Sequence, residues 1–272
     1  MPSLDEIRAA HGWKREYERY LPLSRYVFRP IGFWLSWLAI HLGLTAEAVS
    51  WLSAAAGVLG LAGLMSPRIS LVGAGLALLL LFNLLDCVDG SIARAMGTGN
   101  PYGRFLDSVC GAVVDLGFWA AVGIAAFRHP SLLAKPESFG HGPFLWLVAA
   151  WTTCLLAAYL GQLERSFDEL VRSDWVRLQT AAPARPAAPG PQPAKATVAR
   201  RLRPGVREVV TNLRVRETQY VLLAVAAVLG VVDLLVVGYL GFYLILDVSL
   251  LAVYARRGRQ VRGGRRAPAS SA

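Results

Sequence analysis

Long apolar runs, separated by short polar or charged stretches, are the most regular feature of the sequence. About 20 apolar residues in a helix cross the hydrocarbon core of a bilayer. A long run, residues 220–254, is expected to divide near 233–238 into two helices. Four shorter runs have roughly the length of one span each: residues 46–65, 71–87, 105–127 and 144–163. The pattern therefore predicts an all-α integral membrane protein with six transmembrane helices.

A shorter apolar run, residues 31–42, comes before the first of these spans. It is too short to cross a bilayer, it follows Arg25 and Arg29, and it contains three large aromatic side chains. Basic and aromatic residues gather at the headgroup layer of a membrane. We therefore expect an interfacial amphipathic helix that lies in the membrane surface ahead of the first span.

Changes in composition divide the chain into five segments. Residues 1–43 form a cytoplasmic N-terminal region with the interfacial helix, and residues 44–163 hold the first four spans with a group of acidic residues. Residues 164–216 begin with an amphipathic helical pattern and continue as a basic linker rich in proline and alanine. Residues 217–255 hold the last two spans, and residues 256–272 form a basic tail that we expect to be disordered.

Composition and charge agree with a membrane protein and indicate its orientation. The chain is 55% hydrophobic with 8 Trp, which excludes an ordinary soluble domain. If the N-terminus is cytoplasmic, only Arg68, Arg128 and Lys135 of the 28 basic residues lie outside, and the other 25 lie inside. Basic residues collect on the cytoplasmic side of membrane proteins, so we expect both termini there. The net charge of +10 then indicates attraction to anionic lipids and no binding of nucleic acid.

Three carboxylates lie where two of the predicted spans meet. Asp86 and Asp89 are three residues apart and share one face of a helix, on which Gly90 and Ala93 also fall. Asp107 follows a turn and can face them from the next, antiparallel helix. Charge inside a membrane is costly and usually functional. Carboxylate ligands of this kind suit Mg²⁺ or Mn²⁺, ions that commonly accompany phosphates.

The spacing of these residues resembles the signature of the CDP-alcohol phosphotransferase family, also called the CDP-alcohol phosphatidyltransferases. The signature has the form D-x2-D-G-x2-A-R-x8-G-x3-D-x3-D. Its matching positions here are Asp86, Asp89, Gly90, Ala93, Arg94, Gly103 and Asp107. The last position departs from the signature, because Gly111 stands where the family has Asp, and Asp115 lies one turn further on.

This resemblance implies a reaction and roles for the matching residues. A phosphatidyl or other phospho-alcohol group would move from a CDP-linked lipid or alcohol donor to the hydroxyl of a small or lipid alcohol acceptor, releasing CMP in phospholipid biosynthesis. The ligands of Mg²⁺ or Mn²⁺ would be Asp86, Asp89 and Asp107. The nucleotide-binding residues would be Gly90, Ala93, Arg94 and Gly103. The resemblance also implies a homodimer. We expect the protein in a bacterial inner or plasma membrane, and the distribution of basic residues predicts that the site faces the cytoplasm.

The missing acid at position 111 leaves the catalytic base open. Asp115 lies four residues beyond Gly111, about 6 Å further along a helix and rotated by about 40°, so it faces nearly the same way. Either Asp115 substitutes as the catalytic residue, directly or through a water, or it is a buried acid paired within the bundle.

Other interpretations of the acids also stay open. They could pair with arginines such as Arg94 and Arg104 simply to hold helices together. A catalytically impaired relative that binds a CDP-lipid or scaffolds a membrane complex would explain Gly111. A transporter would also place acids in membrane helices, although it does not predict the Asp-Gly-x2-Ala-Arg run. Metal-dependent release of CMP separates the transferase from the impaired relative, and flux without turnover would indicate a transporter.

A group of basic residues precedes the fifth predicted span and includes Arg207, Arg214 and Arg216. Such a group binds a phosphorylated acceptor at the membrane surface, or it only sets the topology of the chain.

We predict opposite results from reporter fusions at Lys135 and within the proline-rich linker at 181–199. The distribution of basic residues puts Lys135 outside and the linker in the cytoplasm, so a reporter that is active only outside the cytoplasm should be active at Lys135 alone. Equal activity at the two positions would contradict the six-span topology.

Overall fold

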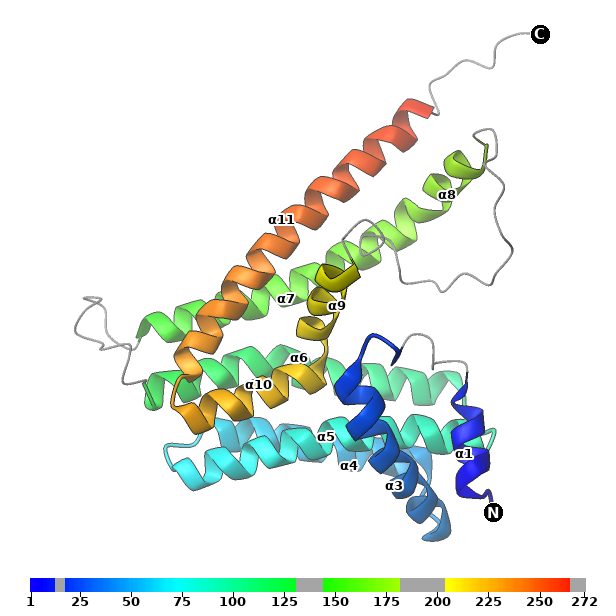
Figure 1. Ribbon diagram of the computed structural model, residues 1–272, viewed down its shortest axis with the longest axis vertical. Helices are drawn as coiled ribbons and strands as arrows, with labels where there is room; N and C mark the ends of the chain where they lie inside the picture. The colour runs from blue at the N-terminus through cyan, green and yellow to red at the C-terminus, as the bar shows by residue number, and fades with distance from the viewer. Residues whose placement is uncertain (13–17, 131–143, 182–203, 265–272) are drawn as a thin grey trace.

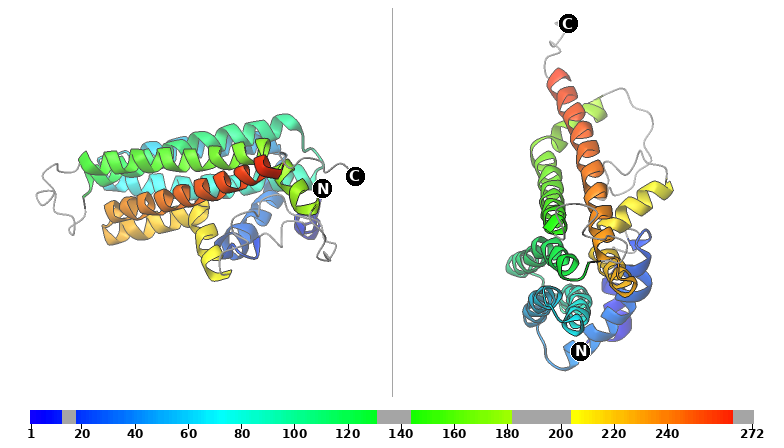
Figure 2. Two further views of the ribbon diagram at one scale, coloured as in Figure 1. Left: turned by 90° about the horizontal axis from the view of Figure 1, so that it is seen from above. Right: turned by 90° about the vertical axis from the view of Figure 1, so that its left-hand side faces the viewer.

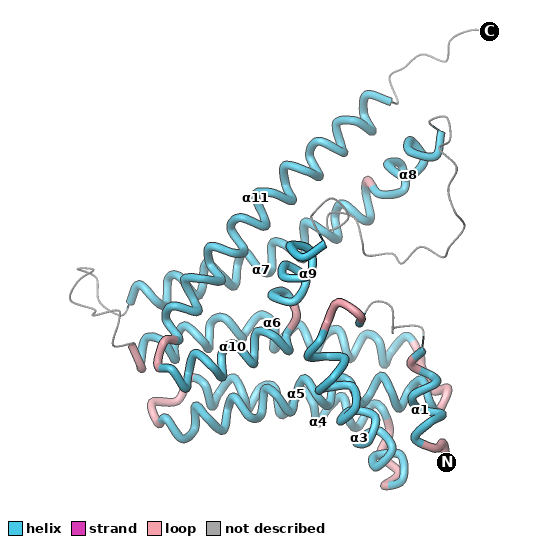
Figure 3. The backbone as a smooth tube through the Cα atoms, in the orientation of Figure 1, coloured by secondary structure: helices cyan, strands magenta, loops and turns pink. Residues whose placement is uncertain are grey.

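The computed structural model of the protein describes residues 1–12, 18–130, 144–181 and 204–264, and in them every regular element is a helix (Figure 1 and Figure 3). The N-terminal elements are α1 (Leu4–Ala10), the π-helical turn η2 (Ser24–Phe28) and α3 (Arg29–His41). The next four helices are α4 (Ala46–Leu64), α5 (Ile69–Ala95), α6 (Pro101–Arg128) and α7 (Phe144–Leu170). The C-terminal elements are α8 (Arg172–Ala181), α9 (Pro204–Arg214), α10 (Arg216–Leu229) and α11 (Val232–Gly264).

Five of the described helices, α4, α5, α6, α7 and α11, are long and apolar enough to cross a membrane. The protein therefore has the all-α architecture of an integral membrane protein, as the sequence predicts. α3 stands ahead of the first of these helices, where the sequence predicts an interfacial helix. α10 has only 14 residues, so the count of six spans stays a prediction.

The break between α10 and α11 comes earlier in the chain than expected. Gly230 ends α10 with a φ of 68°, a left-handed conformation that glycine adopts without steric cost. The predicted division near 233–238 is therefore wrong in its position, since these residues lie inside α11. Asp233 instead lies in the first turn of α11, where its carboxylate accepts a hydrogen bond from the amide of Leu234 (2.9 Å).

α4 and α5 form an antiparallel pair whose backbones touch through glycines. A Cβ atom on Gly75 of α5 would lie 2.6 Å from the carbonyl oxygen of Gly60 on α4. A Cβ atom on Gly57 would meet both Phe82 of α5, at 3.1 Å, and Val114 of α6, at 2.5 Å. Small residues let membrane helices approach closely. α4 is thus wedged against both helices that carry the acidic residues.

The remaining helices complete the bundle around this pair. α6 packs against α4 and α7, α11 packs along α7, and α1, α3 and α10 lie against α5 (Figure 2). In Figure 1, α7 and α11 run at an angle to the layer formed by α4, α5 and α6. Aromatic rings of Phe118, Trp119, Tyr220 and Tyr239 contact one another in the core between α6, α10 and α11.

The end of α11 differs from the tail predicted from residue 256 onward. The helix continues to Gly264, so the prediction of disorder is wrong for residues 256–264. Side-chain contacts with α7 and α8 explain the difference. Tyr254 stacks on Phe167, and the Arg257 guanidinium lies over the rings of Phe167 and Trp175, 5.9 and 5.6 Å from their centroids.

The segment after the fourth predicted span is helical, as its amphipathic pattern predicts. α7 runs on past residue 163 to Leu170, and α8 follows it. The loop at 131–143, the proline-rich part of the linker at 182–203 and the last residues, 265–272, lie outside the described residues.

We predict that Gly75→Ala lowers the thermal stability of the protein in detergent, by about 1–3 kcal/mol, because its methyl group would strike the backbone of α4. Gly73→Ala is the matched control, since nothing lies within 4 Å of its added Cβ and alanine favours a helix over glycine. Equal stability of the two variants would show that the glycine contact does not constrain the α4–α5 pair.

Candidate active site

Two helices that are joined by a short turn carry the carboxylates of the signature. Asp86 and Asp89 lie in the last three turns of α5, and Asp107 lies in the second turn of α6. Gly97, with a φ of 64°, turns the chain after α5. The side chain of Asn100 then caps α6 by accepting a hydrogen bond from the amide of Gly103 (2.8 Å). The expected turn between the two parts of the signature is confirmed.

Asp89 is buried and its carboxylate is directed toward α4. The hydroxyl of Ser50 on α4 donates a hydrogen bond to Asp89 Oδ2 (2.6 Å), and the amide of Gly90 contacts Oδ1. Ser50 is a member of the site that sequence reasoning missed. The signal that could have found it is a hydroxyl in an otherwise apolar span.

Asp86 and Asp107 approach each other from the two helices. Their carboxyl groups lie within hydrogen-bonding reach of each other. Two carboxylates this close repel each other unless a proton or a cation lies between them. The contact therefore marks a place where positive charge is favourable.

The donor set fits a hard divalent cation in its chemistry, although the three acids do not yet converge. Within the described ranges, no three His, Cys, Asp or Glu side chains are placed to hold a metal ion together. Asp86 and Asp107 meet, whereas Asp89 is held by Ser50. Carboxylate oxygens are the ligands that Mg²⁺ and Mn²⁺ prefer. Asp89 keeps free lone pairs beside these hydrogen bonds, so its carboxylate could join the other two after a change of its orientation.

Arg216, the first residue of α10, contacts acids of both α5 and α6. Its Nε and one terminal nitrogen donate to the two carboxylate oxygens of Asp115, at 2.6 and 2.9 Å. Its other terminal nitrogen donates to Asp86 Oδ1 at 3.3 Å. The guanidinium also lies over the ring of Phe82, 5.3 Å from its centroid. A bidentate arginine–carboxylate pair is among the stronger polar contacts in proteins.

Gly111 makes room for this arginine. A Cβ atom at position 111 would lie 2.5 Å from the Arg216 terminal nitrogen. The space where the family signature has an aspartate side chain is therefore filled by a guanidinium group. One of the two expectations for Asp115 is a buried acid paired within the bundle. Asp115 is paired with Arg216, but its side chain is half exposed (50%) and not buried.

The four residues expected to bind the nucleotide have local roles in the structure as well. The guanidinium of Arg94 lies against Gly90, where an added Cβ would be 3.1 Å from it, and it donates a weak hydrogen bond to Ser91 (3.4 Å). Gly103 belongs to the capped first turn of α6. Ala93 is partly exposed beside them.

The basic residues Arg207, Arg214 and Arg216 are not an open cluster of free charges. Arg214 pairs with Glu164 of α7 at 2.8 Å, and Arg207 lies over the ring of Tyr20, 5.2 Å from its centroid. With Arg216 bound to Asp86 and Asp115, each of the three arginines already has its own partner.

Comparison with known proteins identifies the region that contains the acids. Residues 43–162 match the sequence model of the CDP-alcohol phosphatidyltransferase family. A phosphatidylinositol phosphate synthase of Mycobacteroides abscessus is 36% identical over 107 residues, which cover 37% of this chain and 48% of that protein. A protein of the same name from Mycolicibacterium smegmatis is 32% identical over 120 residues, which cover 42% and 48%. The chain thus spans about half the length of the curated relatives it matches.

The matched region contains α4, α5 and α6, and therefore every acid of the site, whereas Arg216 lies beyond it. The family expected from the spacing of the acids is also the family that the matched region indicates. Residues 43–162 are a CDP-alcohol phosphatidyltransferase domain.

Proposed function

We propose that the protein is a membrane transferase of phospholipid biosynthesis, which moves a phosphatidyl group from a CDP-linked donor to an alcohol and releases CMP. The observation that carries this proposal is the contact of Asp86 and Asp107 across α5 and α6, inside the matched domain. The names of the two relatives support transfer of a phosphatidyl group. The acceptor remains a small or lipid alcohol, because Arg207, Arg214 and Arg216 are each engaged.

The residues of the site divide the work of such a reaction. Asp86, Asp89 and Asp107 would hold Mg²⁺ or Mn²⁺, an ion that would neutralise the charge of the donor diphosphate as CMP leaves. Gly90 and Ala93 would leave space beside these carboxylates for the nucleotide. The guanidinium of Arg94 would offer positive charge to its phosphates.

The acceptor hydroxyl must also lose a proton to a group within hydrogen-bonding reach. Asp115 is the candidate base in place of the acid missing at position 111. Both of its oxygens are bound by Arg216. Asp115 can serve as the base only where Arg216 releases at least one of these oxygens.

The contact between Arg216 and Asp115 favours a second function. The protein would then be a relative that binds a CDP-lipid or scaffolds a membrane complex without turnover. In this case Gly111 and Arg216 replace the last acid of the signature by a fixed positive charge. The lipid-binding part of the domain would be retained while the base is lost. The two functions differ in whether CMP is released.

We further propose that the site faces the cytoplasm, in the inner or plasma membrane of a bacterium, and that the protein associates with anionic lipids and forms a homodimer. The placement of basic residues supports the orientation and the lipid contact. The homodimer rests on family resemblance.

We predict metal-dependent release of CMP when the purified protein is incubated with CDP-diacylglycerol, Mg²⁺ and a panel of alcohols. Asp86→Asn, Asp89→Asn and Asp107→Asn should each lower the rate at least about 100-fold, because each removes a charge from the centre of the site. Ser108→Ala, a change at the exposed neighbour of Asp107, is the matched control. Parental rates in all three variants would contradict this site.

If the parent protein releases no CMP with any alcohol, this result favours the binding function, and two variants at position 111 test it further. Gly111→Asp restores the acid of the signature, whereas Gly111→Asn adds the same shape without its charge. Release of CMP by Gly111→Asp alone would identify the natural protein as a relative that has lost its chemistry. Loss of a parental activity in Asp115→Asn would identify Asp115 as the substitute.

We predict that Arg216 and Asp115 stabilise each other by about 1–3 kcal/mol in a double-mutant cycle of thermal unfolding with Arg216→Gln and Asp115→Asn. Gly111→Ala should reduce this coupling, because its methyl group displaces the guanidinium. Arg214→Gln, which breaks only the pair with Glu164, should show no coupling to Asp115. A coupling energy that Gly111→Ala leaves unchanged would contradict this account of Gly111.

A further inference from the structure

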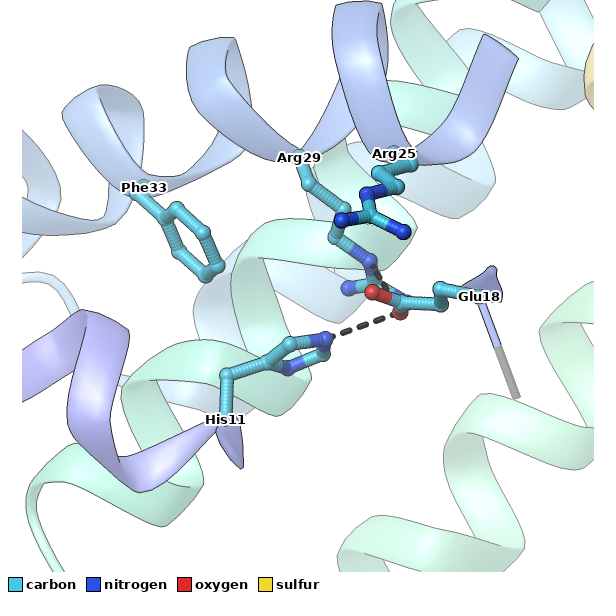
Figure 4. Close-up of a pocket in the computed structure, with 5 residues that line it drawn as sticks. All are labelled: His11, Glu18, Arg25, Arg29 and Phe33. Carbon is cyan, nitrogen blue, oxygen red and sulfur yellow. Dashed lines mark hydrogen bonds and ion pairs between the residues drawn. The ribbon is translucent and has the colours of Figure 1, made fainter. Parts of the chain in front are cut away.

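A cavity of about 210 Å³ lies in the N-terminal region, between the chain before α3 and α3 itself. Its lining residues are His11, Glu18, Arg25, Arg29 and Phe33 (Figure 4). None of these residues belongs to the signature of acidic residues. The cavity has room for more than a single water, whose share of liquid volume is roughly 30 Å³.

The anionic group in the cavity is already neutralised by one of the two arginines. Glu18 Oε1 accepts a hydrogen bond from His11 Nε2 and forms an ion pair with Arg29 Nε, each at 2.8 Å. Burial raises the pKa of Glu18, but the hydrogen bond from His11 and the charge of Arg29 outweigh burial, and the pKa lies below its usual value. Glu18 is therefore ionised at neutral pH and compensates Arg29.

Arg25 is the cation in the cavity that has no anionic partner. Its guanidinium lies over the ring of Tyr26, 5.4 Å from the centroid, but it makes no ion pair in the ranges that the structure describes, and its side chain is exposed. Figure 4 shows the guanidinium of Arg25 directed into the same space as the guanidinium of Arg29 and the carboxylate of Glu18. Two arginines four residues apart on one helical segment repel each other. Arg29 also lies close enough to Arg94 to act on it electrostatically. Positive charge thus exceeds negative charge here, and one more anion would balance it.

His11 supplies a second, independent polar group. Its side chain is 3% exposed, and its Nδ1 has no hydrogen-bond partner among the described residues. A carboxylate only accepts hydrogen bonds, so Nε2 carries the proton shared with Glu18, and Nδ1 is free to bond a ligand. Neutral Nδ1 accepts from a hydroxyl of a phosphate monoester, and protonated Nδ1 donates to any phosphate oxygen. A buried polar atom without a partner is costly, and such a ligand would satisfy it.

The surroundings of the cavity are those of a membrane surface. Tyr26, Ile31 and Trp34, on η2 and α3, are large apolar or aromatic side chains that stay exposed in the structure. Exposed aromatic residues beside arginines are typical of the headgroup layer. A phosphate at this depth is available both from lipid headgroups and from solution.

We propose that the cavity formed by His11, Glu18, Arg25, Arg29 and Phe33 is a second anion site, which binds a phosphate group separately from the carboxylates of α5 and α6. Arg25 binds the phosphate with its planar fork of donors, which matches phosphate oxygens in a bidentate manner. His11 contributes the remaining hydrogen bond, and the pair of Glu18 and Arg29 fixes the wall of the site. This site does not depend on the proposed transferase activity.

Calorimetric titration of the full chain in detergent micelles tests the site with two probes, inorganic phosphate and short-chain dihexanoyl phosphatidylglycerol, at constant ionic strength. Arg25→Gln should weaken binding at least about tenfold, because a hydrogen bond to a charged group is lost. Arg25→Lys keeps the charge without the fork and should fall between Arg25→Gln and the parent. Arg8→Gln is the matched control, since Arg8 pairs only with exposed Asp5 at 3.3 Å.

The outcomes of this titration distinguish the source of the phosphate. If Arg25→Gln weakens the binding of both probes, the site accepts any phosphate. If it weakens the binding of the lipid alone, the ligand is a headgroup. If it weakens the binding of inorganic phosphate alone, the ligand is free phosphate. Binding should persist in Asp86→Asn, which alters the other site. The proposal is overturned if Arg25→Gln and Arg8→Gln bind both probes equally well, or if Asp86→Asn abolishes the binding that depends on Arg25.

Discussion

The guanidinium of Arg216 joins carboxylates from two helices and so determines the form of the site. It binds both oxygens of Asp115 on α6 and one oxygen of Asp86 on α5. A guanidinium that pairs with two carboxylates is held by charge-assisted hydrogen bonds, and α10 begins where its first side chain reaches both acids. Gly111 is the residue whose lack of a side chain permits this approach. The departure from the family signature and the approach of Arg216 are therefore one structural feature.

The glycine contacts of α4 place the other half of the site. Because α4 touches the backbone of α5 and the side chains of α6, it carries Ser50 to within hydrogen-bonding distance of Asp89. Asp89 is consequently held by Ser50 of α4, whereas Asp86 lies beside Asp107 and is held by Arg216. A divalent cation that binds all three acids would share them with a hydroxyl and a guanidinium group.

Charge is paired in the same way in the N-terminal region of the chain, which packs on α5. Glu18, His11 and Arg29 form a buried network that ties the segment before α3 to the helix itself. α1 and α3 both pack on α5, so this network lies next to the end of the signature that carries Arg94. A phosphate in the cavity would therefore act close to the proposed nucleotide-binding residues while remaining a separate ligand.

The sequence by itself determined the helical spans, the helix ahead of them, and the acids with their departure at Gly111. These features follow from local patterns, because burial in a bilayer requires a run of apolar residues and a shared helix face requires a fixed spacing. The tertiary structure alone decided which partners the acids have. Arg216 is 101 residues from Asp115 and 130 from Asp86, and Ser50 is 39 residues from Asp89. No local pattern contains such distances, because an ion pair depends on how whole helices pack. Tertiary packing also decided the last turns of α11. Their arginines predict a disordered tail from sequence alone, but aromatic rings of α7 and α8 contact Arg257 and the helix continues.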